Sequence, residues 1–198
     1  MRLPRPARLR RAFLLVLLAA AGSAALHGTT VVKMTFSEVV DAATVISVGT
    51  VSSVEYVWDA EQGIPFTDVT FADLDVLHGT IPGSDLKLRF TGGPTPDGLV
   101  LEIAGMPRFT AGQRTVIFSD PAGGGICPLV GWWQGLYRVA RDTERGVDVV
   151  FDHAGVPMVG FDGPPGELVA RVSAPAGAGV PPSQLTLGTF TALIQAEL

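Results

Sequence analysis

Glycine and proline punctuate this chain at short intervals, and their spacing limits what it can fold into. The 198 residues include 24 glycines and 15 prolines, well above average usage. They gather in clusters between short apolar runs, as at 92–98 and 121–125. Clusters of this kind mark turns between strands. The chain is therefore predicted to be mainly β, forming a small antiparallel barrel, with a sandwich as the second choice.

The apolar runs carry the two-residue period of strands. In the run over 67–77, the apolar residues change from one strand face to the other between Phe71 and the pair Leu74 and Val76. A bulge near Ala72 and Asp73 would return these side chains to one face. Strands are predicted over 44–58, 67–77, 86–90, 99–103, 115–118, 136–141 and 147–151.

Two short helices are predicted beside the strands. Thr35 and Glu38 have the spacing of a capping box at the start of a helix over 36–43. A C-terminal helix is predicted over 185–198, with Thr186 as its N-cap, because its apolar residues have helical spacing.

Residues 1–25 have the composition of a secretory signal peptide. Five arginines precede an uninterrupted apolar run over 12–21, and small residues follow it. Cleavage is predicted after Ala25, with Ala21 as the second choice. The pair Arg10-Arg11 leaves the twin-arginine export route open beside the general secretory route. The run is shorter than the roughly 20 residues that span a bilayer, so no stable membrane insertion is expected after cleavage.

The predicted mature chain has three parts and works outside the cytoplasm. A β-barrel-like domain over 26–173 is followed by a proline-rich linker over 174–184 and by the C-terminal helix. The expected location is the periplasm or the exterior of the cell, because signal peptides direct export.

Charge and cysteine content exclude several classes of partner. Five of the 14 basic residues lie in the leader, whereas the 19 acidic residues all lie beyond it, so the mature net charge is near −10. An acidic surface repels phosphate backbones and anionic lipids, so neither nucleic acid nor a membrane surface is expected as a partner. Cys127 is the only cysteine, and we predict a buried, inert thiol without an internal disulfide.

The sequence contains no recognised catalytic or metal-binding motif. The spacings of His27, His78 and His153 match no metal-ligand pattern, and no serine occupies a nucleophile elbow. No metal and no cofactor are predicted. Asp73 and Asp75 are expected to face solvent. A hydrolase or metal-dependent enzyme with a site assembled from His78, His153 and nearby acidic residues is the alternative.

Aromatic residues supply the candidate ligand-binding positions Trp58, Trp132, Trp133 and Tyr137. Neighbouring residues of a strand face opposite sides, so one of the adjacent tryptophans would enter the core while the other projects outward. An exposed tryptophan beside a tyrosine would bind a peptide or a sugar. Burial of both tryptophans in the core or under the C-terminal helix is the competing interpretation.

Several short segments of the chain form a familiar series, and they lie at 43–51, 56–58, 67–70, 76–79, 90–93, 105–109, 112, 130–131 and 134–139. The series resembles exported bacterial β-rich proteins with an oligonucleotide/oligosaccharide-binding-like (OB-like) barrel and uncharacterised function, and the likeness covers 35–139. The motifs are turn and core residues, so the resemblance implies a fold and carries no catalytic residues across.

A fainter likeness is to netrin-like domains, which include metalloprotease inhibitors on a barrel of this kind. Netrin-like domains depend on disulfides and often on an N-terminal cysteine, and this chain has neither. An immunoglobulin-like sandwich is a second topology, although its usual paired cysteines are missing.

These observations favour an exported, non-catalytic binding or accessory domain that contacts an extracytoplasmic protein or peptide. The enzyme built around His78 and His153 is one alternative. A structural component of the cell envelope is the other.

Overall fold

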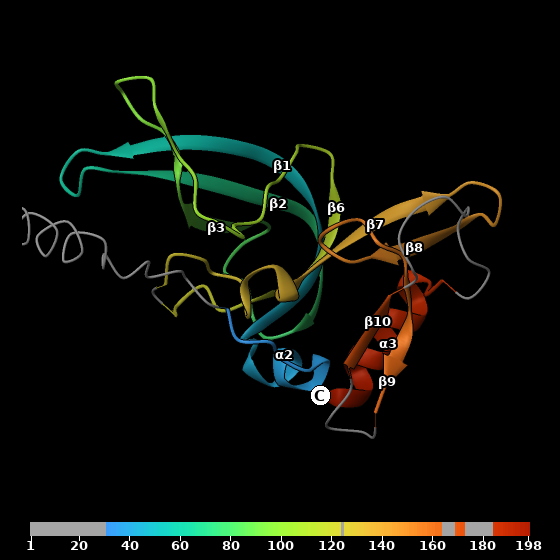
Figure 1. Ribbon diagram of the computed structural model, residues 1–198. Helices are drawn as coiled ribbons and strands as arrows, with labels where there is room; N and C mark the ends of the chain where they lie inside the picture. The colour runs from blue at the N-terminus through green and yellow to red at the C-terminus, as the bar shows by residue number, and fades with distance from the viewer. Residues whose placement is uncertain (1–30, 124, 164–168, 173–183) are drawn as a thin grey trace, which may run out of the picture. The chain divides into compact units, whose positions relative to one another are not determined.

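The computed structural model describes residues 31–123, 125–163, 169–172 and 184–198. The described part is mainly β, with a short helix near its beginning and a second helix at its end (Figure 1), as predicted. The predicted signal peptide over 1–25, His27 and residues 174–183 of the predicted linker lie outside the described residues. No helix in the described ranges is long and apolar enough to cross a membrane.

One antiparallel sheet of six strands organises the fold, in the order β3-β2-β1-β6-β7-β8. In the described part of the chain the outer strands β3 and β8 do not pair with each other, so the sheet curves without closing into a barrel. Its strands are β1 (Val45–Asp59), β2 (Ile64–His78), β3 (Leu86–Thr91), β6 (Arg114–Ser119), β7 (Leu136–Asp142) and β8 (Val147–Phe151).

Two small antiparallel pairs accompany this sheet. One joins β4 (Gly93–Pro94) to β5 (Val100–Leu101), and the other joins β9 (Met158–Asp162) to β10 (Val169–Val172). The prediction of a strand over 99–103 is wrong except at Val100 and Leu101, which form β5. Its alternating leucines are exposed, because β5 pairs only with the two residues of β4. The β9–β10 pair was not predicted from the sequence.

A bulge bends β2 where the apolar phase slips. Strand β1 pairs Thr50 with Ala72 and then Val48 with Asp75, so β2 carries an extra residue between these pairs. Asp73 has a left-handed φ of 51° at this point. The predicted bulge is therefore confirmed, and Asp73 and Asp75 are exposed as expected.

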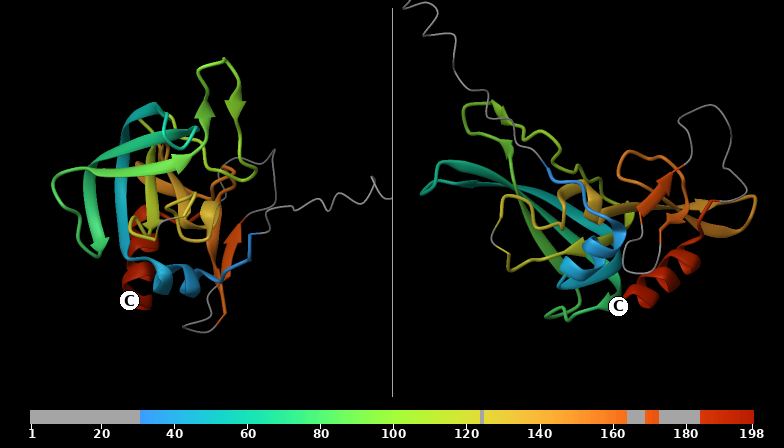
Figure 2. Two further views of the ribbon diagram at one scale, coloured as in Figure 1. Left: turned by 90° about the vertical axis from the view of Figure 1, so that its left-hand side faces the viewer. Right: turned by 60° about the horizontal axis from the view of Figure 1, so that its bottom comes forward.

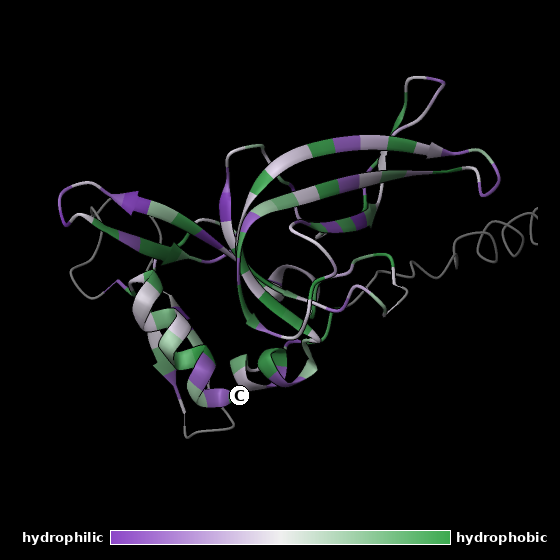
Figure 3. Ribbon diagram, turned by 180° about the vertical axis from the view of Figure 1, so that it is seen from behind, coloured by the Kyte–Doolittle hydropathy of each residue, from purple (hydrophilic) through white to green (hydrophobic). Residues whose placement is uncertain are grey.

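The side chains after the bulge follow the prediction only in part. Leu74 packs against the core, but Val76 is 42% exposed, so the prediction for Val76 was wrong. A second register shift, between Ile46 and Ser47, changes the phase of β2 again and lets Leu77 pack inward instead. Figure 3 shows hydrophobic and hydrophilic residues alternating along β1 and β2.

The central strands bury side chains on both faces. In β6, Val116 and Phe118 enter one hydrophobic cluster while Ile117 enters the other, as the two-residue period of a strand requires. We call the cluster containing Phe36, Phe118, Tyr137, Phe190 and Ile194 the helix-side core. The hairpin-side core contains Val51, Val69, Phe71, Leu86, Leu88, Phe90, Ile117, Leu129 and Leu136.

Both helices pack on the helix-side core and lie side by side (Figures 1 and 2). Helix α2 (Phe36–Ala42) begins with the predicted capping box, in which Thr35 accepts from the Glu38 backbone and Glu38 accepts from the Thr35 backbone. Helix α3 (Leu187–Glu197) begins after Thr186, whose hydroxyl accepts from the Thr189 backbone, as predicted.

The segment before α3 is hydrogen-bonded to β8 and β9. The Val150 N–H donates to the Leu185 carbonyl over 3.0 Å, and the Leu185 N–H donates to the Met158 carbonyl over 2.8 Å. Gln184 is buried and its side-chain amide donates to the Val150 carbonyl. These bonds fix the position of α3, and with it Phe190 in the helix-side core.

Candidate functional site

The adjacent tryptophans lie on a single turn of 3-10 helix, η1 (Trp132–Gly135), and not on a strand. Gly131 and Trp132 both have left-handed backbone conformations, with φ of 57° and 61°. Extended strand geometry is impossible there, so the prediction that the two tryptophans alternate between strand faces was wrong. Both side chains are half-buried.

Trp133 is held by close contact with two other segments. A Cβ on Gly105 would lie 2.4 Å from Cζ3 of Trp133, so the indole rests directly on the backbone of this glycine. On the other side, the ring centroids of Trp133 and His153 are 5.8 Å apart. The indole position is therefore defined by packing from 105 and from the turn after β8.

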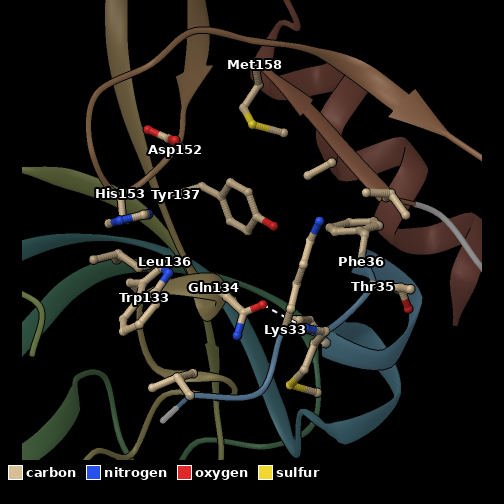
Figure 4. Close-up of a pocket in the computed structure, with 15 residues that line it drawn as sticks. Lys33, Thr35, Phe36, Trp133, Gln134, Leu136, Tyr137, Asp152, His153 and Met158 are labelled. Carbon is tan, nitrogen blue, oxygen red and sulfur yellow. Dashed lines mark hydrogen bonds between the residues drawn. The ribbon is translucent and has the colours of Figure 1, made fainter. Parts of the chain in front are cut away.

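Trp133 and His153 form part of the wall of a cavity of about 350 Å³ (Figure 4). Several parts of the fold contribute to it: the segment 31–35, which we call the N-terminal segment, together with η1, β7, the turn after β8 and the β9–β10 pair. Its lining consists of Val31, Lys33, Met34, Thr35, Phe36, Val39, Trp133, Gln134, Leu136, Tyr137, Asp152, His153, Met158, Val169 and Ala170. We call this space the Trp133 cavity.

Gln134 fixes the N-terminal segment as one wall of the Trp133 cavity. Its Oε1 accepts from the Met34 N–H over 2.8 Å, and its Nε2 donates to the Val32 carbonyl over 2.9 Å. Lys33 lies between these two anchored residues, and its side chain extends into the cavity toward Tyr137 (Figure 4). The cavity lining thus contains one ammonium group, Lys33, and one carboxylate, Asp152, among mainly aromatic and aliphatic side chains.

The two titratable rings of the cavity are held neutral near pH 7. Burial, and secondarily the charge of Asp152, raise the pKa of Tyr137. Burial lowers the pKa of His153; the nearby Asp152 opposes this shift and Arg138 adds to it. The Asp152 carboxylate accepts from the backbone N–H groups of Ala154 and Val156, so it shapes the turn that carries His153.

A second cavity, of about 370 Å³, is also lined by the rings of Trp133 and His153. Trp133, Leu136 and His153 line both spaces. The lining of this second cavity also includes Met106, Arg108 and Arg138, which places two cationic side chains there.

The four predicted site residues do not all lie in one place. Trp133 and Tyr137 are brought together in the Trp133 cavity, but Tyr137 is 5% exposed and belongs mainly to the core. Trp132 is not part of the cavity lining. Trp58 lies near the far end of β1, where it is 40% exposed.

The residues considered for metal or thiol chemistry also separate. His78 ends β2 and is not part of the cavity that contains His153. The described ranges contain no group of three His, Cys, Asp or Glu side chains placed to hold a metal ion. Cys127 is half-buried, and burial raises its thiol pKa to about 11, which keeps the thiol protonated at neutral pH.

Sequence reasoning missed Lys33, Gln134 and Asp152. Met34 and Gln134 are 100 positions apart in the sequence, and no local period reports such a contact. Nothing in the sequence at 152–155 connects that turn to η1. Comparison of the chain with protein-family models, curated proteins and solved structures found no match.

Proposed function

We propose that this chain is an exported, non-catalytic binding domain that receives an apolar side chain of a protein or peptide partner in the Trp133 cavity. The leader composition supports export. The volume of about 350 Å³ lies within the roughly 300 to 1,000 Å³ that is usual for ligand sites. Apolar walls with a few polar groups are typical of binding pockets.

The observation that carries this proposal is the combination of aromatic walls with one ammonium group, in a lining whose one carboxylate, Asp152, already accepts two backbone hydrogen bonds. Phe36, Trp133 and Tyr137 offer ring surfaces, while Lys33 offers positive charge. An apolar side chain close to a carboxylate fits both features. The carboxyl-terminal residue of a polypeptide, when apolar, has this chemistry.

The hydroxyl groups of the cavity favour binding over covalent catalysis. Thr35 accepts from the Glu38 backbone as the cap of α2, and the raised pKa of Tyr137 keeps its phenol protonated. Neither oxygen is activated as a nucleophile in this arrangement.

A matched pair of probes tests the proposal. N-acetyl-phenylalanine carries a carboxylate, whereas N-acetyl-phenylalaninamide has the same ring without the charge. Tryptophan fluorescence of the full chain should report tighter binding of the acid, by roughly fivefold for one partly exposed ion pair. Lys33→Gln should remove this preference, and Trp133→Phe should remove the fluorescence response.

Trp58→Phe serves as the control, because Trp58 lies outside the cavity lining. It should leave the response to both probes unchanged. Equal affinity for the acid and the amide, or a response lost in Trp58→Phe but kept in Trp133→Phe, would contradict the proposal.

The enzymatic alternative has one favourable observation: His153 is a neutral imidazole on the wall of two cavities. A neutral imidazole is able to act as a general base. Ester hydrolysis by the purified chain that disappears in His153→Ala, with or without a stoichiometric metal, would favour this alternative over simple binding.

A further inference from the structure

Among the residues that the structure describes, the distal half of β1 has a free backbone edge. Strand β6 pairs with β1 only from Val45 to Thr50. The last bonds on that side join Val51 to Gln113 and to Gly112. In the described ranges, no strand continues along this side of β1 from Ser52 to Asp59, although β2 pairs with the other side throughout.

The register shows which backbone groups point out from this edge. Trp58 is opposite Pro65, and Pro65 has no N–H, so this pair is one of the non-hydrogen-bonded pairs of the ladder. Such pairs alternate along antiparallel strands, and no register shift interrupts β1 between Ser53 and Asp59. Val54, Tyr56 and Trp58 therefore direct their N–H and C=O groups away from β2.

The β2–β3 ladder agrees with this phase. Thr67 and Val69, opposite Tyr56 and Val54, also pair with Phe90 and Leu88 of β3. In the described part of the chain, no hydrogen bond satisfies the outward backbone groups of Val54, Tyr56 and Trp58. A strand with unpaired groups of this kind is a template for adding another strand.

Apolar side chains accompany the same three residues. Tyr56 is 64% exposed and Trp58 is 40% exposed, and the period of the strand places both on the face of Val54. Val54 and Tyr56 also line a groove of about 650 Å³ that continues past Val100 and Leu101 of β5.

The charges of the free edge are all of one sign. Every charged residue from Ser52 to Gly63 is acidic, namely Glu55, Asp59 and Glu61. In the described part of the chain, Glu55 has no cationic partner, and its carboxylate accepts a weak hydrogen bond from the Ser53 hydroxyl at 3.5 Å. Antiparallel pairing with the same edge of a second copy, centred on Tyr56, would place two Glu55 carboxylates on one face as diagonal neighbours, which is unfavourable. A basic partner complements the edge instead.

We propose that β1 accepts an extended peptide segment with alternating apolar and basic side chains as an additional strand along Val54–Trp58. Backbone bonds to Val54, Tyr56 and Trp58 supply the attachment. Apolar side chains of the peptide lie beside Tyr56 and Trp58, and its lysines or arginines lie beside Glu55. This surface is separate from the Trp133 cavity, and it is independent of the function proposed above.

Amide hydrogen exchange on the full chain tests strand addition directly. The probe is a short peptide of alternating valine and lysine with blocked ends. Saturating peptide should slow exchange at Val54, Tyr56 and Trp58 by at least about tenfold. Glu55 and Val57 are internal controls, because their N–H groups already face β2, and their exchange should change much less.

Two matched probes separate the backbone and charge contributions. The same peptide with N-methyl groups on the amides that would face β1 should lose about tenfold or more in affinity, because these amides can no longer donate hydrogen bonds to the β1 carbonyl groups. Glu55→Lys should weaken the lysine peptide by roughly two- to fivefold and improve a valine–glutamate peptide by a similar factor.

Three outcomes would overturn the proposal. The first is unchanged exchange at Val54, Tyr56 and Trp58 with saturating peptide. The second is equal affinity for the lysine and glutamate peptides. The third is protection of the three amides in the chain alone that grows with protein concentration, which would identify a second copy as the occupant. Trp133→Phe should leave all these results unchanged, so failure here is distinguishable from failure of the cavity proposal.

Discussion

Asp68 is the clearest case of a single residue whose surroundings define its ionisation. Its side chain is 1% exposed, and its carboxylate lies 2.6 Å from Nε of Arg89 and 3.1 Å from Nζ of Lys87. The bond from Arg89 is the largest cause that holds the pKa of Asp68 below its ordinary value, with Lys87 adding to it and burial opposing it. A lowered pKa contributes stability above the ordinary carboxyl pKa and loses it as the pH falls toward the folded-state value.

Asp68→Asn should therefore lower the free energy of unfolding by about 2 kcal/mol near pH 7. The deficit should shrink below about pH 4, where the wild-type carboxylate begins to protonate. Urea unfolding at both pH values measures this. Asp73→Asn, at an exposed position, is the control and should have little effect; a deficit for Asp68→Asn that stays constant with pH would refute the linkage.

Gly105 lies directly against the indole ring of Trp133. It has a φ of 79°, and an added Cβ would meet the Trp133 ring. Gly112 has a similar φ of 85° with nothing within 4 Å of an added Cβ. Gly105→Ala and Gly112→Ala should share a backbone cost of about 1 kcal/mol, but only Gly105→Ala should shift the tryptophan emission. Equal emission changes in the two variants would show that Gly105 does not position Trp133.

At the scale of elements, the capping box connects α2 to the helix-side core. Thr35→Ala should lower the free energy of unfolding by about 1 kcal/mol, because the Glu38 backbone N–H loses its acceptor. Thr35→Ser keeps the hydroxyl and should stay close to the wild type in thermal unfolding. A serine variant as unstable as the alanine variant would point to lost methyl packing instead of lost capping.

The elements that the sequence predicted are those with local signals. The β7–β8 hairpin combines alternating residues with a polar turn over 142–146, and the Thr35–Glu38 spacing is diagnostic by itself. The strand over 99–103 had the right period, but tertiary structure covered neither face. Strand β9 lacked an alternating pattern because Gly160 interrupts it. In the cavity, Trp133 and Tyr137 were predictable from composition, whereas Lys33 depends on the contact of Gln134 with the distant N-terminal segment.

Across the described part of the molecule, the largest core joins residues from both of its ends. Phe190 is 0% exposed, and its ring centroid is 5.6 Å from that of Phe36 and 4.8 Å from that of Tyr137. Phe190→Ala should lower the free energy of unfolding by about 3 to 5 kcal/mol. Leu198→Ala, at a position 51% exposed, is the control and should cost little. Denaturation of Phe190→Ala close to that of the control would mean that α3 adds little to the core.

The position of Phe190 also bears on the order in which the helix-side core can form during synthesis. The ring of Phe36 packs against those of Phe118, Tyr137 and Phe161 and also against Phe190, which lies in α3, the last helix of the described part. Until α3 has been synthesised, the apolar side chains of α2, β6 and β7 lack the cover that Phe190 and Ile194 supply. The helix-side core therefore cannot be completed before the residues of α3 have left the ribosome.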